Sequence, residues 1–174
     1  MNGGICCISL VTEVIPEMKL KNWKIYAFWI ALSLGVGGLS GLLSRGGVEA
    51  FEQNAVQPPL SPPGFLFPIV WGILYTLMGI SAARVWLTEP SLARSKGINL
   101  FITQLVVNFF WSLIFFELGA YGFALIWLLI LWVLVAWMIK VFFKTDPLAA
   151  WLQIPYLIWL TFAAYLNAGV WYLN

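Results

Sequence analysis

Aromatic side chains at helical spacing are the residues of this chain best suited to bind a ligand. Phe67, Trp71 and Tyr75 recur at intervals of four, shortly after a proline pair that ends at Pro63. Prolines fit the first turn of a helix, so the three rings should share one face of a helix that begins near Pro63. Such a face is typical of a lipid-facing belt, a packing seam or a ligand wall, and the three alternatives stay open.

A second face combines two amides with two rings. Gln104, Asn108, Trp111 and Phe115 follow one another at spacings of four, three and four, which aligns them on one side of a helix. Uncharged amides at membrane depth need hydrogen-bond partners. Joining helices is the commoner use of such amides, whereas the adjoining Trp111 favours ligand contact.

A third face follows Pro155, which should kink its helix because the ring clashes with the carbonyl of Trp151. Beyond the kink, Trp159 is followed on the same face by Ala163 and Leu166. The small residue could make room for a flat ligand against the indole or for a neighbouring helix, and packing is the commoner of the two uses.

The composition places these helices in a bilayer. Hydrophobic residues make up 62% of the chain and charged residues 9%, against roughly half and about a quarter in ordinary soluble domains. Charge-free runs long enough to span the hydrocarbon core recur along the chain. The expected fold is therefore an all-α integral membrane protein, a five-transmembrane-helix bundle. The helices are expected at residues 25–44, 65–87, 97–117, 120–144 and 148–172.

Two segments lie outside these helices. Residues 45–61 form a long first loop that holds prolines and carboxylates, and we expect either a lid over a pocket or a solvated connector. Residues 1–24 form an N-terminal extension, which we expect to be disordered or to lie upstream of an initiator at Met18.

Several kinds of chemistry are excluded by composition. The chain has no histidine, and Cys6 and Cys7 are its two cysteines. A Ser-His-Asp triad, a histidine-ligated haem and a histidine-containing zinc site therefore cannot be built. No acid–base pair lies in the expected spans, so we expect no conventional enzyme, no metal site and no nucleic-acid partner.

The basic residues predict an orientation, because lysine and arginine are retained on the cytoplasmic side. In a five-helix layout Arg45 lies at one end of the bundle, and eight other basic residues lie at the opposite end. These are Lys19, Lys21, Lys24, Arg84, Arg94, Lys96, Lys140 and Lys144. We therefore expect a bacterial plasma membrane protein with a cytoplasmic N-terminus and with the first loop and C-terminus outside.

Three motifs in order carry a family resemblance that covers about residues 25–174. They are Pro62-Pro63-Gly64 to Val70-Trp71 with Leu74-Tyr75 and Met78-Gly79, Asn108-Phe109-Phe110-Trp111 with Phe115-Phe116, and Pro155-Tyr156-Leu157-Ile158-Trp159 with Phe162-Ala163-Ala164-Tyr165-Leu166-Asn167. The chain thereby resembles the TspO/MBR family, the tryptophan-rich sensory or translocator proteins that include the mitochondrial peripheral-type benzodiazepine receptor.

The resemblance implies a five-helix bundle that binds protoporphyrin IX, haem and isoquinoline or benzodiazepine drugs in a cavity closed by the first loop. It implies no resident cofactor, since porphyrin or haem is the ligand. Trp71 and Trp159 match tryptophans tied in the family to light-driven porphyrin degradation. The expected ligand-binding residues are Phe67, Trp71, Tyr75, Gln104, Asn108, Trp111, Phe115, Trp159, Phe162, Ala163 and Leu166.

The chain also departs from the family. Phe51-Glu52 and Leu60 stand where members often have Trp-Tyr and a tryptophan. The C-terminal segment ends at Asn174 without the basic residue of the animal cholesterol motif, which weighs against a sterol partner.

The leading functional expectation is a porphyrin receptor or sensor. The alternatives are light-dependent porphyrin degradation through Trp71 and Trp159, and transport of a tetrapyrrole or sterol. Membrane lipid is an expected partner. The small-xxx-small pair Gly37 and Gly41 fits internal packing or, as the alternative, homodimer contact.

Overall fold

The computed structural model describes the backbone of residues 5–174 and the side chains from Asn22 onward. Most of the expected extension at 1–24, with the proposed start at Met18, therefore lies outside the residues whose side chains are described.

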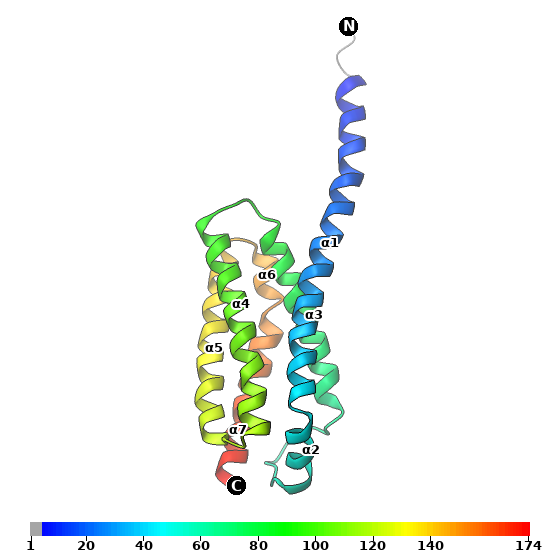
Figure 1. The fold of residues 1–174 in the computed structure, drawn as a ribbon. Coiled ribbons are helices and arrows are strands. Elements are labelled where there is room, and N and C mark those ends of the chain that lie inside the picture. Colours follow the sequence, from blue (N-terminus) through cyan, green and yellow to red (C-terminus); the bar gives the residue numbers. More distant parts are fainter. Residues whose placement is uncertain (1–4) are drawn as a thin grey trace.

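Within that described part, five helical segments are long and apolar enough to cross a membrane, which confirms the predicted fold class. Figure 1 shows these segments running side by side along one axis, with the C-terminus and α2 at the same end. The elements are α1 (Ile5–Leu43), α2 (Arg45–Asn54), α3 (Leu66–Trp86), α4 (Leu92–Ser112), the π-helical turn η1 (Leu113–Glu117), α5 (Tyr121–Phe143), α6 (Pro147–Trp151) and α7 (Ile154–Leu173).

Side-chain caps determine where two of the helices begin. The hydroxyl of Ser91 accepts a 3.1 Å bond from the backbone N–H of Arg94, so α4 begins at Leu92 and not at the predicted residue 97. The carboxylate of Asp146 accepts a 3.1 Å bond from the N–H of Ala149, which starts the last span. Asp146 also pairs with Arg84 of α3 at 2.9 Å and so ties the two helices together.

The last span is broken and not merely bent. Helix α6 ends at Trp151 and α7 begins at Ile154, so the interruption falls just before Pro155. A proline has no N–H to give to the carbonyl of Trp151, which explains why the helix is interrupted there. Gln153 lies in the break and is fully buried.

The first loop contains a helix that the sequence reading did not predict. Helix α2 spans Arg45–Asn54, and its Phe51 packs against the rings of Phe115 and Phe116 at centroid distances of 5.3 and 5.5 Å. Its charged side chains are exposed and Val48 and Phe51 are partly buried, so the short helix is amphipathic. Helix formation here follows from packing against η1, because an isolated helix of ten residues is marginal in water.

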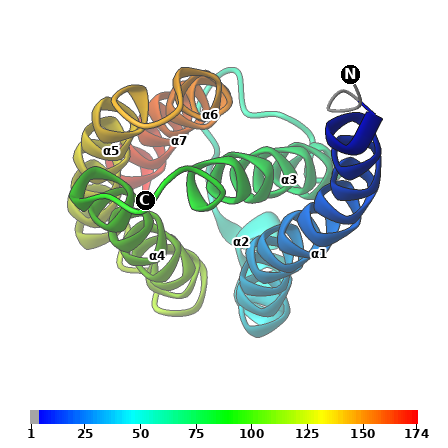
Figure 2. The same ribbon diagram turned by 90° about the horizontal axis from the view of Figure 1, so that it is seen from above.

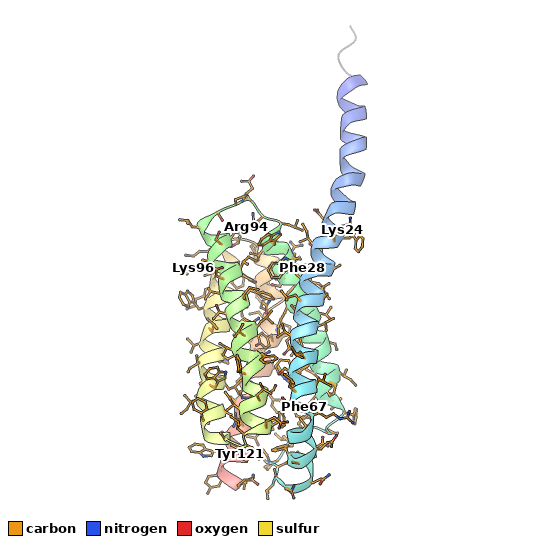
Figure 3. All side chains as sticks on the ribbon, in the orientation of Figure 1. Lys24, Phe28, Phe67, Arg94, Lys96 and Tyr121 are labelled. Carbon is orange, nitrogen blue, oxygen red and sulfur yellow. The ribbon has the colours of Figure 1, made fainter. Side chains whose placement is uncertain are left out.

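Figure 2 looks along the bundle axis, with α3 running between α1 on one side and α4 to α7 on the other. Close backbone approach fixes the α1–α3 pair, because a methyl group at Gly79 would lie 2.5 Å from the Cα of Ile30. The labelled basic residues Lys24, Arg94 and Lys96 gather at the end away from α2, whereas Phe67 and Tyr121 lie near α2 (Figure 3).

Candidate functional site

A cavity of about 600 Å³ opens inside the bundle at the end that carries α2. Residues of α1, α2, α3, α4, η1 and α7 line it, together with the proline-rich segment that follows α2. Its size falls within the range of about 300–1,000 Å³ that is typical of small-molecule sites. We call it the aromatic cavity.

One wall comes from α3 and α7. The indole of Trp71 stacks on the ring of Tyr75, with centroids 5.3 Å apart and planes 30° apart. It meets the indole of Trp159 nearly edge-on, at 6.5 Å and 87°. The ring of Phe67 lies edge-on to Trp159 at 6.0 Å. Four rings therefore form a continuous aromatic surface along the side of the cavity.

The opposite wall comes from α4 and η1. The rings of Trp111 and Phe115 stack at 5.3 Å with planes 27° apart. The side-chain carbonyl of Asn167 on α7 accepts a 3.4 Å bond from the indole N–H of Trp111, and its amide donates 2.8 Å to the carbonyl of Tyr121. Asn167 therefore holds the indole of Trp111 in place and joins α7 to this wall.

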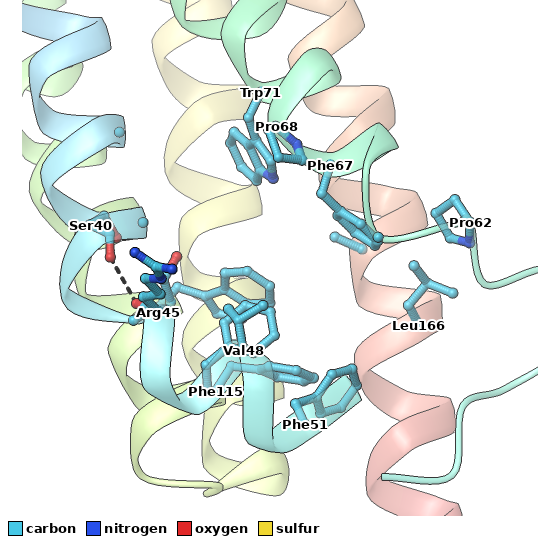
Figure 4. A pocket seen from close by; sticks show the side chains of 18 of the residues that line it. Ser40, Arg45, Val48, Phe51, Pro62, Phe67, Pro68, Trp71, Phe115 and Leu166 are labelled. Atoms are coloured by element: carbon cyan, nitrogen blue, oxygen red, sulfur yellow. Dashed lines mark hydrogen bonds between the residues drawn. The ribbon is translucent and has the colours of Figure 1, made fainter. Parts of the chain in front are cut away.

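Helix α2 closes the end of the cavity. Figure 4 shows Val48 and Phe51 below the indole of Trp71, with Arg45 to one side. The guanidinium of Arg45 pairs with Glu49 at 3.1 Å, and both side chains are largely exposed. The charged groups of the cavity lining are therefore Arg45, Glu49 and Glu52, all on α2, and the other walls are mainly apolar and aromatic.

The first turn of α2 is attached to η1. The carboxylate of Glu117 accepts a 2.9 Å bond from the backbone N–H of Gly47, one of the helix N–H groups that have no partner within the helix. A side chain at residue 47 would meet the backbone of Phe116, so only glycine allows this close approach. The negative carboxylate also lies near the positive end of the α2 dipole.

The segment after α2 is attached to α7. The side-chain carbonyl of Asn174 accepts a 2.9 Å hydrogen bond from the backbone N–H of Val56, and its side-chain NH₂ donates a 3.0 Å hydrogen bond to the backbone carbonyl of Val56. The hydroxyl of Tyr165 donates 3.0 Å to the carbonyl of Pro59. Residues 45–61 are therefore held at both ends, as a cover over the aromatic cavity would require.

The structure brings together most, but not all, of the predicted ligand-binding residues. Eight of them line the cavity: Phe67, Trp71, Tyr75, Trp111, Phe115, Trp159, Ala163 and Leu166. Gln104, Asn108 and Phe162 do not line it. The first two are buried and point at tyrosine hydroxyls, and Phe162 packs beside Trp159 at 5.6 Å from outside the lining.

Sequence reasoning missed the contribution of α1. Gly37, Gly38, Ser40 and Gly41 line the cavity, although the Gly37 and Gly41 pair was interpreted as packing or dimer contact. A side chain at Gly37 would overlap the ring of Tyr75, whereas one at Gly41 would meet no atom within 4 Å. The run of small residues in α1 could have predicted this contribution, because small side chains leave room for a cavity as well as for a neighbouring helix.

The donor set of the site favours stacking over coordination. Among the residues whose side chains are described, no three histidine, cysteine, aspartate or glutamate side chains come together as metal ligands would. Aromatic faces bind a flat apolar molecule through dispersion, quadrupole interactions and removal of surface from water. The arrangement therefore suits a planar apolar ligand between the aromatic walls.

The fold and cavity define a five-helix integral membrane protein with an internal aromatic site under a short covering helix. The sequence model of the TspO/MBR family matches residues 29–173, and the chain belongs to that family.

Individual relatives agree over nearly the same length. Protein CrtK of Rhodobacter capsulatus is 34% identical over 151 residues, which cover 86% of this chain and 92% of the relative. The tryptophan-rich protein TspO of Chlorobaculum tepidum is 33% identical over 157 residues, or 85% and 94% of the two chains. The human translocator protein is 36% identical over 149 residues, or 83% and 86%.

Proposed function

We propose that this protein is a membrane receptor or sensor that binds porphyrins, such as protoporphyrin IX or haem, in the aromatic cavity. Isoquinoline or benzodiazepine-type ligands would occupy the same space. The observation that carries the proposal is the pair of facing aromatic walls, with Trp71 and Trp159 on one side and Trp111 on the other.

The chemistry of the walls matches that of the ligand. A porphyrin is a flat apolar disc, so it gains from stacking on indoles and from burial without needing an axial ligand. Its propionates are anionic, and Arg45 at the mouth is the cation of the cavity lining. A propionate would compete with Glu49 for the guanidinium, an exchange favoured by the weakness of exposed ion pairs.

Light-dependent degradation of the bound porphyrin is a second candidate. The observation that favours it is that Trp71 and Trp159 line the same cavity with their rings 6.5 Å apart. Two oxidisable indoles would then stand beside one photoexcited ligand. In this version of the function the same two residues bind the ligand and react with it.

We also infer the orientation of the protein. Lys24, Arg94 and Lys96 lie at the end of the bundle away from the cavity. By the positive-inside rule that end would face the cytoplasm of a bacterial plasma membrane, so the cavity and α2 would face outside.

A dark titration with protoporphyrin IX tests the binding proposal. Detergent-purified wild type, Trp71→Phe, Trp159→Phe and Trp137→Phe would be followed by tryptophan quenching and porphyrin absorbance. Trp137 is the matched control, because it lies on α5, is 48% exposed and does not line the cavity.

We expect saturable one-site binding that either cavity substitution weakens about two- to tenfold, the loss expected for one aromatic contact of about 0.5–1.5 kcal/mol. The control should bind like wild type. Unsaturable uptake that is equal in all four proteins would contradict the proposal. Illumination of the same samples separates the two candidates, since loss of the porphyrin bands in wild type and control alone would support degradation.

A further inference from the structure

Two buried glutamines carry polar atoms without partners. Gln104 on α4 and Gln153 in the break before α7 are both fully buried. Among the residues whose side chains are described, Nε2 of Gln104 and both Nε2 and Oε1 of Gln153 have no hydrogen-bond partner. Leaving one buried amide group unsatisfied costs about 1–3 kcal/mol, so these three atoms call for a polar partner.

Tyr156 contacts Gln104 and follows Gln153 by three residues in the chain. Its hydroxyl donates a 3.1 Å bond to Oε1 of Gln104. Gln153 precedes it by three residues with helical dihedral angles, and its carbonyl accepts from the N–H of Leu157. Residues three apart with helical dihedral angles share a face, so the side chain of Gln153 projects on the side of the chain that carries Tyr156.

The hydrogen-bonding needs of the unpartnered amide atoms indicate which kind of molecule could bind them. The two Nε2 groups need an acceptor, and Oε1 of Gln153 needs a donor. A cation offers no acceptor and an anion offers no donor, whereas water offers both and typically makes about three hydrogen bonds when buried. We propose that Gln104 and Gln153 hold a buried water site beside Tyr156, at the break between α6 and α7.

This site is separate from the aromatic cavity but adjoins its wall. Neither glutamine lines the cavity. The ring of Tyr156 lies edge-on to the indole of Trp71, with centroids 6.2 Å apart. Bound water would therefore fix the hydroxyl end of Tyr156 and, through its ring, help to position Trp71. The proposal does not depend on the identity of the ligand.

Selective labelling tests the site directly. The chain has four glutamines, Gln53, Gln57, Gln104 and Gln153, so ¹⁵N-glutamine labelling of the full chain gives four side-chain amides. The first two are exposed and serve as internal references. In detergent micelles, nuclear Overhauser transfer from water would separate long-lived bound water from fast surface water by its sign.

We expect the side-chain amides of Gln104 and Gln153 to show nuclear Overhauser transfer from water, with the sign that long-lived bound water gives. The two exposed amides should show only surface exchange. Absence of transfer at either buried amide would overturn the proposal, because the two amides would then not share a long-lived water.

A substitution adds a second readout. Gln153→Leu removes two of the three unpartnered polar atoms while keeping similar bulk, so the water signal at Gln104 should fall at least severalfold. Gln53→Leu is the matched control and should leave that signal unchanged. An unchanged Gln104 signal in Gln153→Leu would contradict a shared site. If that variant does not fold, the wild-type spectrum still decides the question.

Discussion

The side-chain amide of Asn108 donates a 2.9 Å hydrogen bond to the hydroxyl of Tyr75. Both residues are buried, but only Tyr75 lines the aromatic cavity. Asn108 therefore acts on the cavity indirectly, by joining α4 to α3 and fixing one ring of the wall.

Replacing Asn108 by leucine should lower stability more than it lowers ligand affinity. The hydroxyl of Tyr75 would lose its donor, at a cost of about 1 kcal/mol, in the range found for interhelical bonds in membranes. Equilibrium unfolding in mixed micelles measures this cost. Asn99→Leu is the matched control, since Asn99 lies on the same helix and is exposed. Equal destabilisation by both substitutions would contradict a specific role for the bond.

Removing the carboxylate of Glu117 should loosen α2. The Gly47 N–H would lose its 2.9 Å partner, and loss of a cap costs about 1 kcal/mol. Hydrogen exchange at Gly47 in Glu117→Ala should therefore be about fivefold faster. Glu49→Ala removes an exposed carboxylate on α2 itself and should change the rate little. If Glu117→Ala exchanged at the wild-type rate, η1 would not be what anchors the covering helix.

Gly79→Ala should destabilise the bundle by about 1–3 kcal/mol, the usual cost of overpacking. The added methyl group would lie 2.5 Å from the Cα of Ile30, and backbone cannot move aside as a side chain can. Gly72→Ala on the same helix meets nothing within 4 Å and should be neutral or slightly stabilising. Comparable unfolding curves for the two variants would mean that α1 and α3 are not packed this closely.

Much of the fold followed from local chemistry. Five apolar runs predicted five spanning helices, and the structure has five. The last one begins at Pro147 after the Asp146 cap, because a capping carboxylate and a proline both fit a first turn. Helix α2 was not predicted, because its formation depends on Phe51 packing against η1, a contact between segments far apart in the sequence.

The candidate site was predictable as a set of faces but not as a set of neighbours. Periodicity placed Asn108 and Trp111 on one side of α4, yet only the packing shows that the amide meets Tyr75 while the indole reaches the cavity. The contribution of α1 was missed for a related reason. A glycine such as Gly41 has no side chain to suggest a contact, so its role appears only when the opposite wall is in place.

The central claim is that a porphyrin lies between the aromatic walls, and the indole N–H signals of the eleven tryptophans test it most directly. A porphyrin ring shifts the resonances of protons near its face strongly, so adding protoporphyrin IX to ¹⁵N-tryptophan-labelled protein maps its position. We predict large saturable shifts for Trp71, Trp111 and Trp159, with little change for the exposed Trp137 and Trp151. Shifts confined to the exposed tryptophans would place the ligand on the outer surface and would contradict the account.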